Sequence, residues 1–160
     1  MRYAKIREMD ISNGEGIGVA LFTQGCPHHC KNCFNQETWD YDGGKEWTVD
    51  VEDSFLKLLD RSFIKRVTFL GGEPMVYPEE LVLLCKKIRE KRPDIKIWLY
   101  SGYTYGEIRL NKQMCKTLEC IDILVDGRFI EELKDVNLKF KGSSNQRIID
   151  VHNDIVIGED

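Results

Sequence analysis

Apolar runs of strand length alternate with helical patterns along most of the chain, and this alternation restricts the fold more than any other feature. The run Gly18–Thr23 (GVALFT) is typical of a buried strand. Because strands that alternate with helices form parallel sheets with right-handed crossovers, we predict an α/β fold. Its shape would be a partial (βα) barrel, with a mostly parallel curved sheet and helices outside. Further strands are predicted at 67–70, 95–100 and 121–125, and helices at 51–63, 78–92 and 105–118.

The chain beyond residue 126 carries turn residues rather than a clear pattern. Residues 140–150 (FKGSSNQRIID) mix Gly, Ser and Asn with one apolar pair, so we expect a loop before short strands at 148–151 and 155–157. No linker or low-complexity segment interrupts the 160 residues. A chain of this length can build one sizeable core, and we predict a single domain over residues 1–160.

Charge and hydropathy exclude several classes of partner. The formal net charge of −4 indicates no basic surface of the kind that binds nucleic acid or an anionic membrane. No stretch approaches the roughly 20 apolar residues of a spanning helix, and the N-terminus lacks the apolar segment of a signal peptide. We therefore predict a cytoplasmic protein with neither nucleic-acid nor membrane partners.

Three of the six cysteines lie close together in the loop after the first predicted strand. The segment CPHHCKNC places Cys26, Cys30 and Cys33 within eight residues, so their thiols can converge on one metal centre. In a reducing compartment such cysteines more often bind metal than form disulfides. A cubane cluster normally takes four thiolates, so three leave one iron with an open coordination position. The spacing indicates a [4Fe–4S] cluster that can bind a substrate.

Two other interpretations of this loop remain. Zinc could be held by the three cysteines with His28 or His29, although these histidines lie inside the tight loop rather than beyond it. The cysteines could also be unliganded, but a loop containing Pro, His, Lys and Asn is not a core segment. We interpret His28 and His29 as loop-shaping or surface residues. The remaining cysteines are expected to be small buried side chains without chemistry: Cys85, Cys115 and Cys120.

Two motifs carry a resemblance to a known family. The C-x-x-x-C-x-x-C loop follows one predicted strand, and Gly-Gly-Glu-Pro at 71–74 follows the next. Together they resemble the radical S-adenosylmethionine superfamily. More narrowly, the chain is similar over nearly its whole length to the activating proteins of anaerobic ribonucleoside-triphosphate reductase. The segments that carry this similarity are GCPHHCKNCFNQETW, FLGGEP, YSGYT, ILVDGRF and KGSSNQRIID.

The resemblance implies an enzyme with a shortened radical S-adenosylmethionine core. It implies one [4Fe–4S] cluster on the three clustered cysteines, with S-adenosylmethionine on the open iron. Reductive cleavage would yield a 5′-deoxyadenosyl radical that takes hydrogen from a glycine of the reductase large subunit. A one-electron reductant such as flavodoxin or ferredoxin would be the second partner, and no catalytic residue beyond the cofactors is expected. Alternatives are an activase of another glycyl radical enzyme, such as pyruvate formate-lyase, or a noncatalytic zinc-binding interaction module.

The resemblance also implies a role for the turn after the second predicted strand. Gly71 and Gly72 are expected to bring bare backbone close to S-adenosylmethionine, and Glu73 to accept a hydrogen bond from its ammonium group. On this basis Gly72→Val should keep the cluster and lose S-adenosylmethionine. An ordinary Gly-Gly turn is the alternative.

By the same resemblance, Asn32, Cys33 and Phe34 are expected to line the adenine through backbone groups. Asn32 departs from the superfamily pattern, which usually has an aromatic residue there, so its side chain cannot supply the stacking contact. Phe34 could stack instead, or could be a core residue.

The next two strand ends complete the expected cofactor site. Ser101 could bond the ribose or the methionine portion, and Asp126 with Arg128 would face the same rim. Arg128 suits a carboxylate because its guanidinium offers a two-donor fork. A solvated surface pair and a turn Asp are the alternatives. The segment 142–147 could be a docking or gating loop for the partner, or a plain turn.

Overall fold

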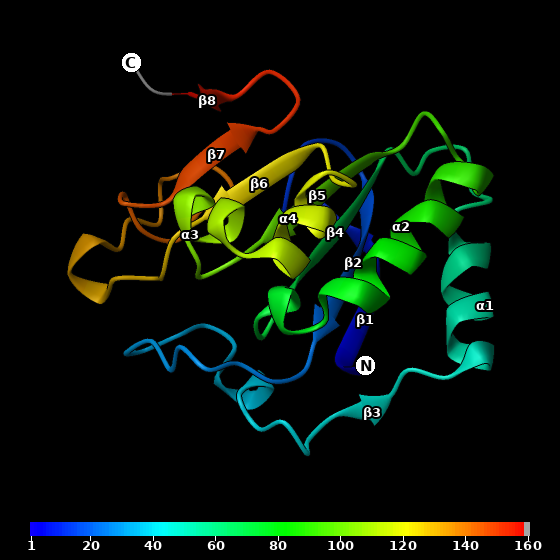
Figure 1. Cartoon of the computed structure of the whole chain (residues 1–160), viewed down its shortest axis with the longest axis horizontal. Coiled ribbons are helices and arrows are strands. Elements are labelled where there is room, and N and C mark those ends of the chain that lie inside the picture. Colours follow the sequence, from blue (N-terminus) through cyan, green and yellow to red (C-terminus); the bar gives the residue numbers. More distant parts are fainter. Residues whose placement is uncertain (159–160) are drawn as a thin grey trace.

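One mixed sheet forms the centre of the fold. The structure, a computed structural model that describes residues 1–158, has a single eight-stranded sheet (Figure 1). The strands are β1 (Arg2–Asp10), β2 (Gly18–Thr23), β3 (Lys45–Glu46), β4 (Arg66–Gly71), β5 (Lys96–Tyr100), β6 (Ile123–Asp126), β7 (Arg147–Asp150) and β8 (Ile155–Ile157). Their order across the sheet is β3-β1-β2-β4-β5-β6-β7-β8, and the central four run parallel.

The α/β class is confirmed, but the expectation of a mostly parallel sheet is wrong. Three of the strand pairs are parallel, and four pairs at the two sides are antiparallel. β1 was not predicted from the sequence because charged residues interrupt its apolar pattern. β3 was not predicted because it has only two residues. β3 and β8 lie at opposite edges, so the sheet is open rather than a closed barrel.

The first two helices show how local signals set helix ends. α1 (Val49–Leu58) begins after Thr48, whose side chain accepts a hydrogen bond from the Val51 N–H. It ends at Leu58, short of the predicted end at residue 63, and Phe63 is exposed. α2 (Pro78–Lys91) starts with a proline at its first position and stops before Pro93, as predicted.

Asn111 divides the predicted helix over 105–118 into two. The backbone of Asn111 is extended, and its side-chain oxygen accepts hydrogen bonds from the N–H groups of Gln113 and Met114. α3 (Tyr105–Leu110) therefore ends before it and α4 (Lys112–Leu118) begins after it. No helix among residues 1–158 has the length and apolar composition that crossing a membrane requires.

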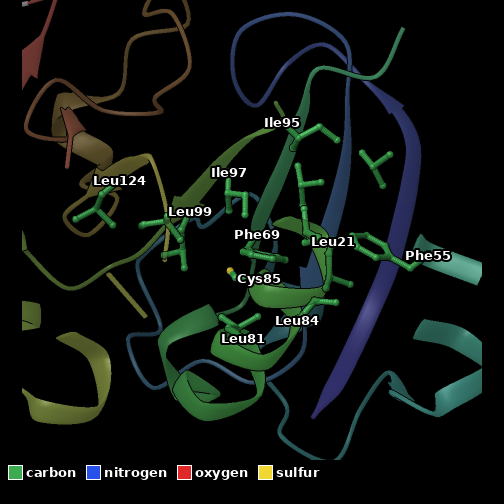
Figure 2. Packing of buried hydrophobic residues seen from close by; sticks show 14 of the residues in the cluster. Leu21, Phe55, Phe69, Leu81, Leu84, Cys85, Ile95, Ile97, Leu99 and Leu124 are labelled. Atoms are coloured by element: carbon green, nitrogen blue, oxygen red, sulfur yellow. The ribbon is translucent and has the colours of Figure 1, made fainter. Parts of the chain in front are cut away.

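The four α-helices pack on one face of the sheet. Leu21 and Phe69 lie on that face between α1 and α2, which contribute Phe55, Leu81 and Leu84 to the same core (Figure 2). Alternate residues of each strand face the helices, which is why the core follows the period of two. The sheet and helices thus form two layers over one continuous apolar cluster.

The three cysteines outside the loop differ in burial. Cys85 on α2 is 1% exposed, and burial raises its pKa to about 12, so it is a core residue as predicted. Cys115 and Cys120 are only partly buried, and the expectation of burial is wrong for them. Both lie at or beyond α4, a short helix at the side of the core.

The other face of the sheet is packed by loops. Ala20, Phe22 and Leu70 form a small apolar cluster there. Beside it the buried guanidinium of Arg66 lies 3.0 Å from the Asp10 carboxylate and donates to the carbonyl oxygens of residues 10, 15 and 16. These bonds hold the loop 11–17 against the sheet and leave the carboxyl ends of the central strands accessible.

Candidate metal centre

The clustered cysteines lie in a loop that leaves the carboxyl end of β2. Gly25 opens this loop with a φ of 107°, a conformation that favours glycine, and the ring of Tyr41 packs directly against it. The Gly25 N–H donates to Thr38 O (2.6 Å), and the Cys26 N–H donates to Trp39 O (3.2 Å). A later segment of the chain therefore holds the start of the loop in place.

All three cysteines line one pocket of about 400 Å³. Phe22, Leu70 and Tyr100 form an apolar part of its wall on the loop-covered face of the sheet. Five more predicted site residues line the pocket: Phe34, Gly71, Gly72, Ser101 and Arg128. Three predicted site residues do not line it: Asn32, Glu73 and Asp126.

Backbone N–H groups point at the sulfur atoms of the clustered cysteines. Burial raises the pKa of Cys26, and backbone hydrogen bonds from His28 and His29 act against this rise. The Asn35 N–H donates to Sγ of Cys33 over 3.4 Å. Such donors stabilise sulfur that carries negative charge, whether as a free thiolate or bound to iron.

The third sulfur lies near a cation. Burial raises the pKa of Cys30, while a backbone hydrogen bond from Phe129 and the charge of Arg128 lower it. Each of the three thiols therefore has a nearby N–H donor in one partly enclosed pocket. This donor set fits an iron–sulfur cluster held by three cysteines.

The histidines of the loop are poorly placed to be zinc ligands. Nε2 of His28 lies 2.7 Å from Oε1 of Glu73, and Nδ1 of His28 accepts a hydrogen bond from Nε of Arg128 (3.2 Å). His29 stacks on Trp39 with ring centroids 4.5 Å apart. Within residues 1–158, no three His, Cys, Asp or Glu side chains lie close enough to share a single ion. A cubane cluster needs wider spacing, because each thiolate binds a different iron.

Glu73 is a buried connector between the cysteine loop and two strand ends. Its carboxylate is 0% exposed and accepts hydrogen bonds from the Met75 N–H (2.9 Å), the Gly102 N–H (2.7 Å) and the Ser101 hydroxyl (2.9 Å), besides its contact with His28. These donors offset the cost of burying its charge. The side chain expected to accept from a cofactor ammonium is thus occupied by protein donors and lies behind the pocket wall.

His28 has partners that were not predicted from the sequence. A loop-shaping or surface residue was expected, whereas only 5% of the His28 side chain is exposed and both ring nitrogens have partners. Tyr103 packs edge-on against the ring at 4.6 Å, and a Cβ at Gly102 would lie 2.6 Å from Nε2. A histidine inside a metal-binding loop, with a glutamate in the turn after the adjacent strand, is the signal that could have indicated this contact.

The two glycines of the turn after β4 approach the cysteine loop itself. Gly71 has a φ of 107°, and a Cβ there would lie 2.7 Å from the backbone nitrogen of Thr23. A Cβ at Gly72 would collide with the carbonyl oxygen of Gly25 and lie 3.0 Å from the carbonyl oxygen of Thr38. Both glycines line the pocket, but the space beside them is filled by protein backbone.

Gly72→Val is therefore expected to disturb the loop as well as the pocket, which changes the outcome predicted from the sequence. The branched side chain would push away the backbone that precedes Cys26, so cluster content after anaerobic reconstitution should fall at least several-fold. Iron and acid-labile sulfide assays measure this loss. The matched control is Gly106→Ala in α3, where a Cβ meets nothing closer than 4.0 Å and cluster content should stay unchanged. Full cluster content in Gly72→Val would contradict the prediction.

Asn32 and Phe34 point in different directions. Asn32 has a φ of 55°, and its exposed side chain donates a hydrogen bond to the Glu131 carboxylate. Phe34 is 61% exposed at the pocket rim, with its ring 5.0 Å from that of Phe129 and 5.3 Å from Nζ of Lys134. Phe34 is therefore not a core residue, and its exposed ring lines the pocket.

Asp126 and Ser101 are committed to the protein scaffold. Asp126 is buried and pairs with the Arg147 guanidinium at 2.6 Å, while its carboxylate also accepts from the Tyr105 N–H. Ser101 donates to Glu73, and its oxygen accepts from the Tyr103 N–H. Of the polar residues expected at these two strand ends, Arg128 is the exposed one with side-chain donors at the pocket.

The segment 142–147 is firmly hydrogen-bonded to the chain after β6. Oε1 of Gln146 accepts from the N–H groups of Gly142 and Ser143, and its Nε2 donates to Gly127 O. Nδ2 of Asn145 donates to Arg128 O over 2.8 Å. These bonds make the segment a support for the backbone that carries Arg128.

Comparison with known proteins shows the family to which the chain belongs. Residues 12–149 match the family described as 4Fe-4S single cluster domain. The anaerobic ribonucleoside-triphosphate reductase-activating protein of Vibrio cholerae is 39% identical, with 92% of this chain and 97% of the relative covered. The protein of the same name from Escherichia coli is 36% identical over 91% of this chain and 96% of the relative. The protein of the same name from phage T4 is 34% identical over 92% of this chain and 93% of the relative. The chain belongs to the family of anaerobic ribonucleoside-triphosphate reductase-activating proteins.

Proposed function

We propose that this protein activates an anaerobic ribonucleoside-triphosphate reductase by cleaving S-adenosylmethionine at a [4Fe–4S] cluster on Cys26, Cys30 and Cys33. The observation that carries this proposal is the pocket that all three thiols line, with N–H donors at the sulfur atoms. When bound, the reduced cluster supplies one electron to the sulfonium, which releases methionine and a 5′-deoxyadenosyl radical. The open, mixed sheet would then be a shortened and incomplete radical S-adenosylmethionine core.

The residues around the pocket suit this chemistry. Its lining includes the cations Arg7, Arg128 and Lys141 but no Asp or Glu from the described part of the chain. A carboxylate on the cofactor would therefore meet a positive field. The apolar wall of Phe22 and Leu70 would keep water from a reactive carbon radical. The chain's own contribution is binding, orientation and exclusion of water rather than acid–base catalysis.

The partner would be the large subunit of the reductase, because its glycine must reach the pocket. The rim there carries the exposed ring of Phe34, with Nζ of Lys134 5.3 Å from it, and the exposed Ile130 lines the adjoining hollow. Exposed apolar residues around a pocket mouth are typical of a protein-binding surface. A one-electron donor of the flavodoxin or ferredoxin class would reduce the cluster.

The decisive test is formation of a glycyl radical on the reductase. Reduced protein, S-adenosylmethionine and the reductase large subunit are mixed without oxygen, and electron paramagnetic resonance is recorded. We expect a doublet that depends on all three components and is absent with the reductase variant in which the acceptor glycine is alanine. Cleavage of S-adenosylmethionine without any doublet would reject the reductase as partner. Absence of both cleavage and cluster absorbance would reject the proposed chemistry.

A further inference from the structure

His28 connects the turn after β4 to the exposed guanidinium of Arg128, which lies near Cys30. Its Nε2 lies 2.7 Å from Oε1 of Glu73, and its Nδ1 lies 3.2 Å from Nε of Arg128. These three residues are 45 and 100 positions apart in the sequence and meet only in the folded chain. The ring of His28 and the side chain of Arg128 both line the pocket and also a second, adjoining hollow.

The partners of His28 define the direction of both hydrogen bonds. A guanidinium Nε can only donate, so Nδ1 of His28 accepts from Arg128. The ring proton then resides on Nε2, which donates to the Glu73 carboxylate. Glu73, His28 and Arg128 thus form a series of two hydrogen bonds: Arg128 donates to Nδ1 of His28, and Nε2 of His28 donates to the Glu73 carboxylate. If the ring proton moved to Nδ1, both hydrogen bonds would be lost.

Glu73 fixes this hydrogen-bonded series to the ends of the strands. Its carboxylate is fixed by the Met75 and Gly102 N–H groups and by Ser101, which belong to the ends of β4 and β5. The imidazole is further confined by Tyr103 at its edge. A ring held on these sides presents Nδ1 in one direction, so the arginine that binds it is oriented too.

Arg128 differs from the other two pocket cations of residues 1–158, because its side chain is bound to the ring of His28 rather than to an oxygen acceptor. Nη1 of Arg7 pairs with Asp10 at 3.0 Å, and Nζ of Lys141 donates to Gln146 O at 3.0 Å. Arg128 uses Nε for His28, which leaves its two terminal amino groups for a ligand at the pocket. A carboxylate bound beside Cys30 is the anion whose geometry matches these groups.

We propose that His28 is a positioning residue: anchored on Glu73, it orients Arg128 so that the guanidinium receives the carboxylate of S-adenosylmethionine. This inference rests on the proposed function, since it assigns a contact to the cofactor that the function requires. In this arrangement the Glu73 carboxylate holds His28 in place and does not itself contact the cofactor. Substitutions at His28 should therefore weaken cofactor binding through Arg128 while the three thiols still assemble the cluster.

Three variants separate the two links of His28. His28→Asn places an amide oxygen where Nδ1 lies and keeps the contact with Arg128. His28→Gln places an amide donor where Nε2 lies and keeps the contact with Glu73, and His28→Phe loses both. After anaerobic reconstitution, iron and sulfide are assayed, and the dissociation constant of S-adenosylmethionine is measured from its effect on the cluster's electron paramagnetic resonance signal. We expect normal cluster content, a weakening of about tenfold or more for Phe and Gln, and a smaller weakening for Asn.

A double-mutant cycle tests whether His28 acts through Arg128, because a purely structural role of His28 would make the two losses of S-adenosylmethionine affinity additive. Arg128→Gln should weaken binding as much as His28→Phe, and the combined variant should be no weaker than Arg128→Gln alone. His29→Asn is the matched control, because residue 29 has a φ of 49° that Asn tolerates and lacks the Glu73 contact. Additive losses, unchanged affinity in His28→Phe, or loss of the cluster in every His28 variant would overturn the inference. Failure of the unmodified protein to bind S-adenosylmethionine would instead refute the proposed function.

Discussion

Replacing Cys30 by Ala is expected to abolish both the cluster and the cleavage of S-adenosylmethionine. With three thiolates for four irons, no spare protein ligand exists in the loop, and a second missing ligand leaves the cubane open to dissociation. The histidines cannot substitute readily, since His28 is engaged at both nitrogens and His29 stacks on Trp39. Visible absorbance, iron content and 5′-deoxyadenosine production should fall to background. The same result is expected for Cys26→Ala and Cys33→Ala.

Cysteines elsewhere provide the matched control for this experiment. Cys115→Ala removes a partly exposed thiol on α4 that does not line the pocket. Its cluster absorbance and cleavage rate should equal those of the unmodified protein. A Cys30→Ala protein with full cluster absorbance would show that the cluster has other ligands. Equal losses in Cys115→Ala would show that the assay reports general unfolding.

Arg66→Met is expected to lower the free energy of unfolding by about 3–5 kcal/mol, because it removes the buried cation beside the Asp10 carboxylate and leaves only the half-exposed Arg7 paired with it. Arg66 and Asp10 are both fully buried, and Nη2 and Oδ2 are 3.0 Å apart. The guanidinium also holds the carbonyl oxygens of residues 10, 15 and 16, which lose their donors in the variant. Urea unfolding of the reconstituted protein measures the loss.

An exposed ion pair provides the comparison for Arg66. Lys91→Met breaks the pair between Lys91 and Asp60 at the surface, where the expected loss is at most about 1 kcal/mol. Similar losses for Arg66→Met and Lys91→Met would contradict the structural role of the buried pair.

Stability should also depend on the protonation of Asp10. Burial raises the pKa of Asp10, but hydrogen bonds from Arg7 and Asn13 and the charge of Arg66 lower it below the ordinary 3.8. A lowered folded-state pKa stabilises the fold above the unfolded pKa, and this stabilisation is lost as pH falls through the folded value. Asp10→Asn should therefore be less stable than the unmodified protein at pH 7, with a difference that shrinks toward pH 3. A constant difference over this range would contradict the assignment.

Sequence patterns located the central strands well because these strands are buried on both faces. The run of β2 is apolar almost throughout, and the positions of β4 and β5 agree with prediction within one or two residues. The antiparallel strand β1 was harder to predict, since a half-exposed strand tolerates Lys and Arg between its apolar residues. The division at Asn111 was missed because a single capping side chain overrides an otherwise continuous helical pattern.

The sequence by itself predicts that Cys26, Cys30 and Cys33 lie together, because three thiols within eight residues need no distant part of the chain to meet. It also determined which strand ends approach this loop, since parallel strands place their carboxyl ends at one edge. Only the tertiary structure decided which polar side chains face the pocket. Glu73 and Asp126 are bound by donors from distant segments, and Arg128 donates a hydrogen bond to His28. The physical reason is that a buried charge takes whichever partners the fold brings within hydrogen-bonding distance, and sequence spacing does not encode that competition.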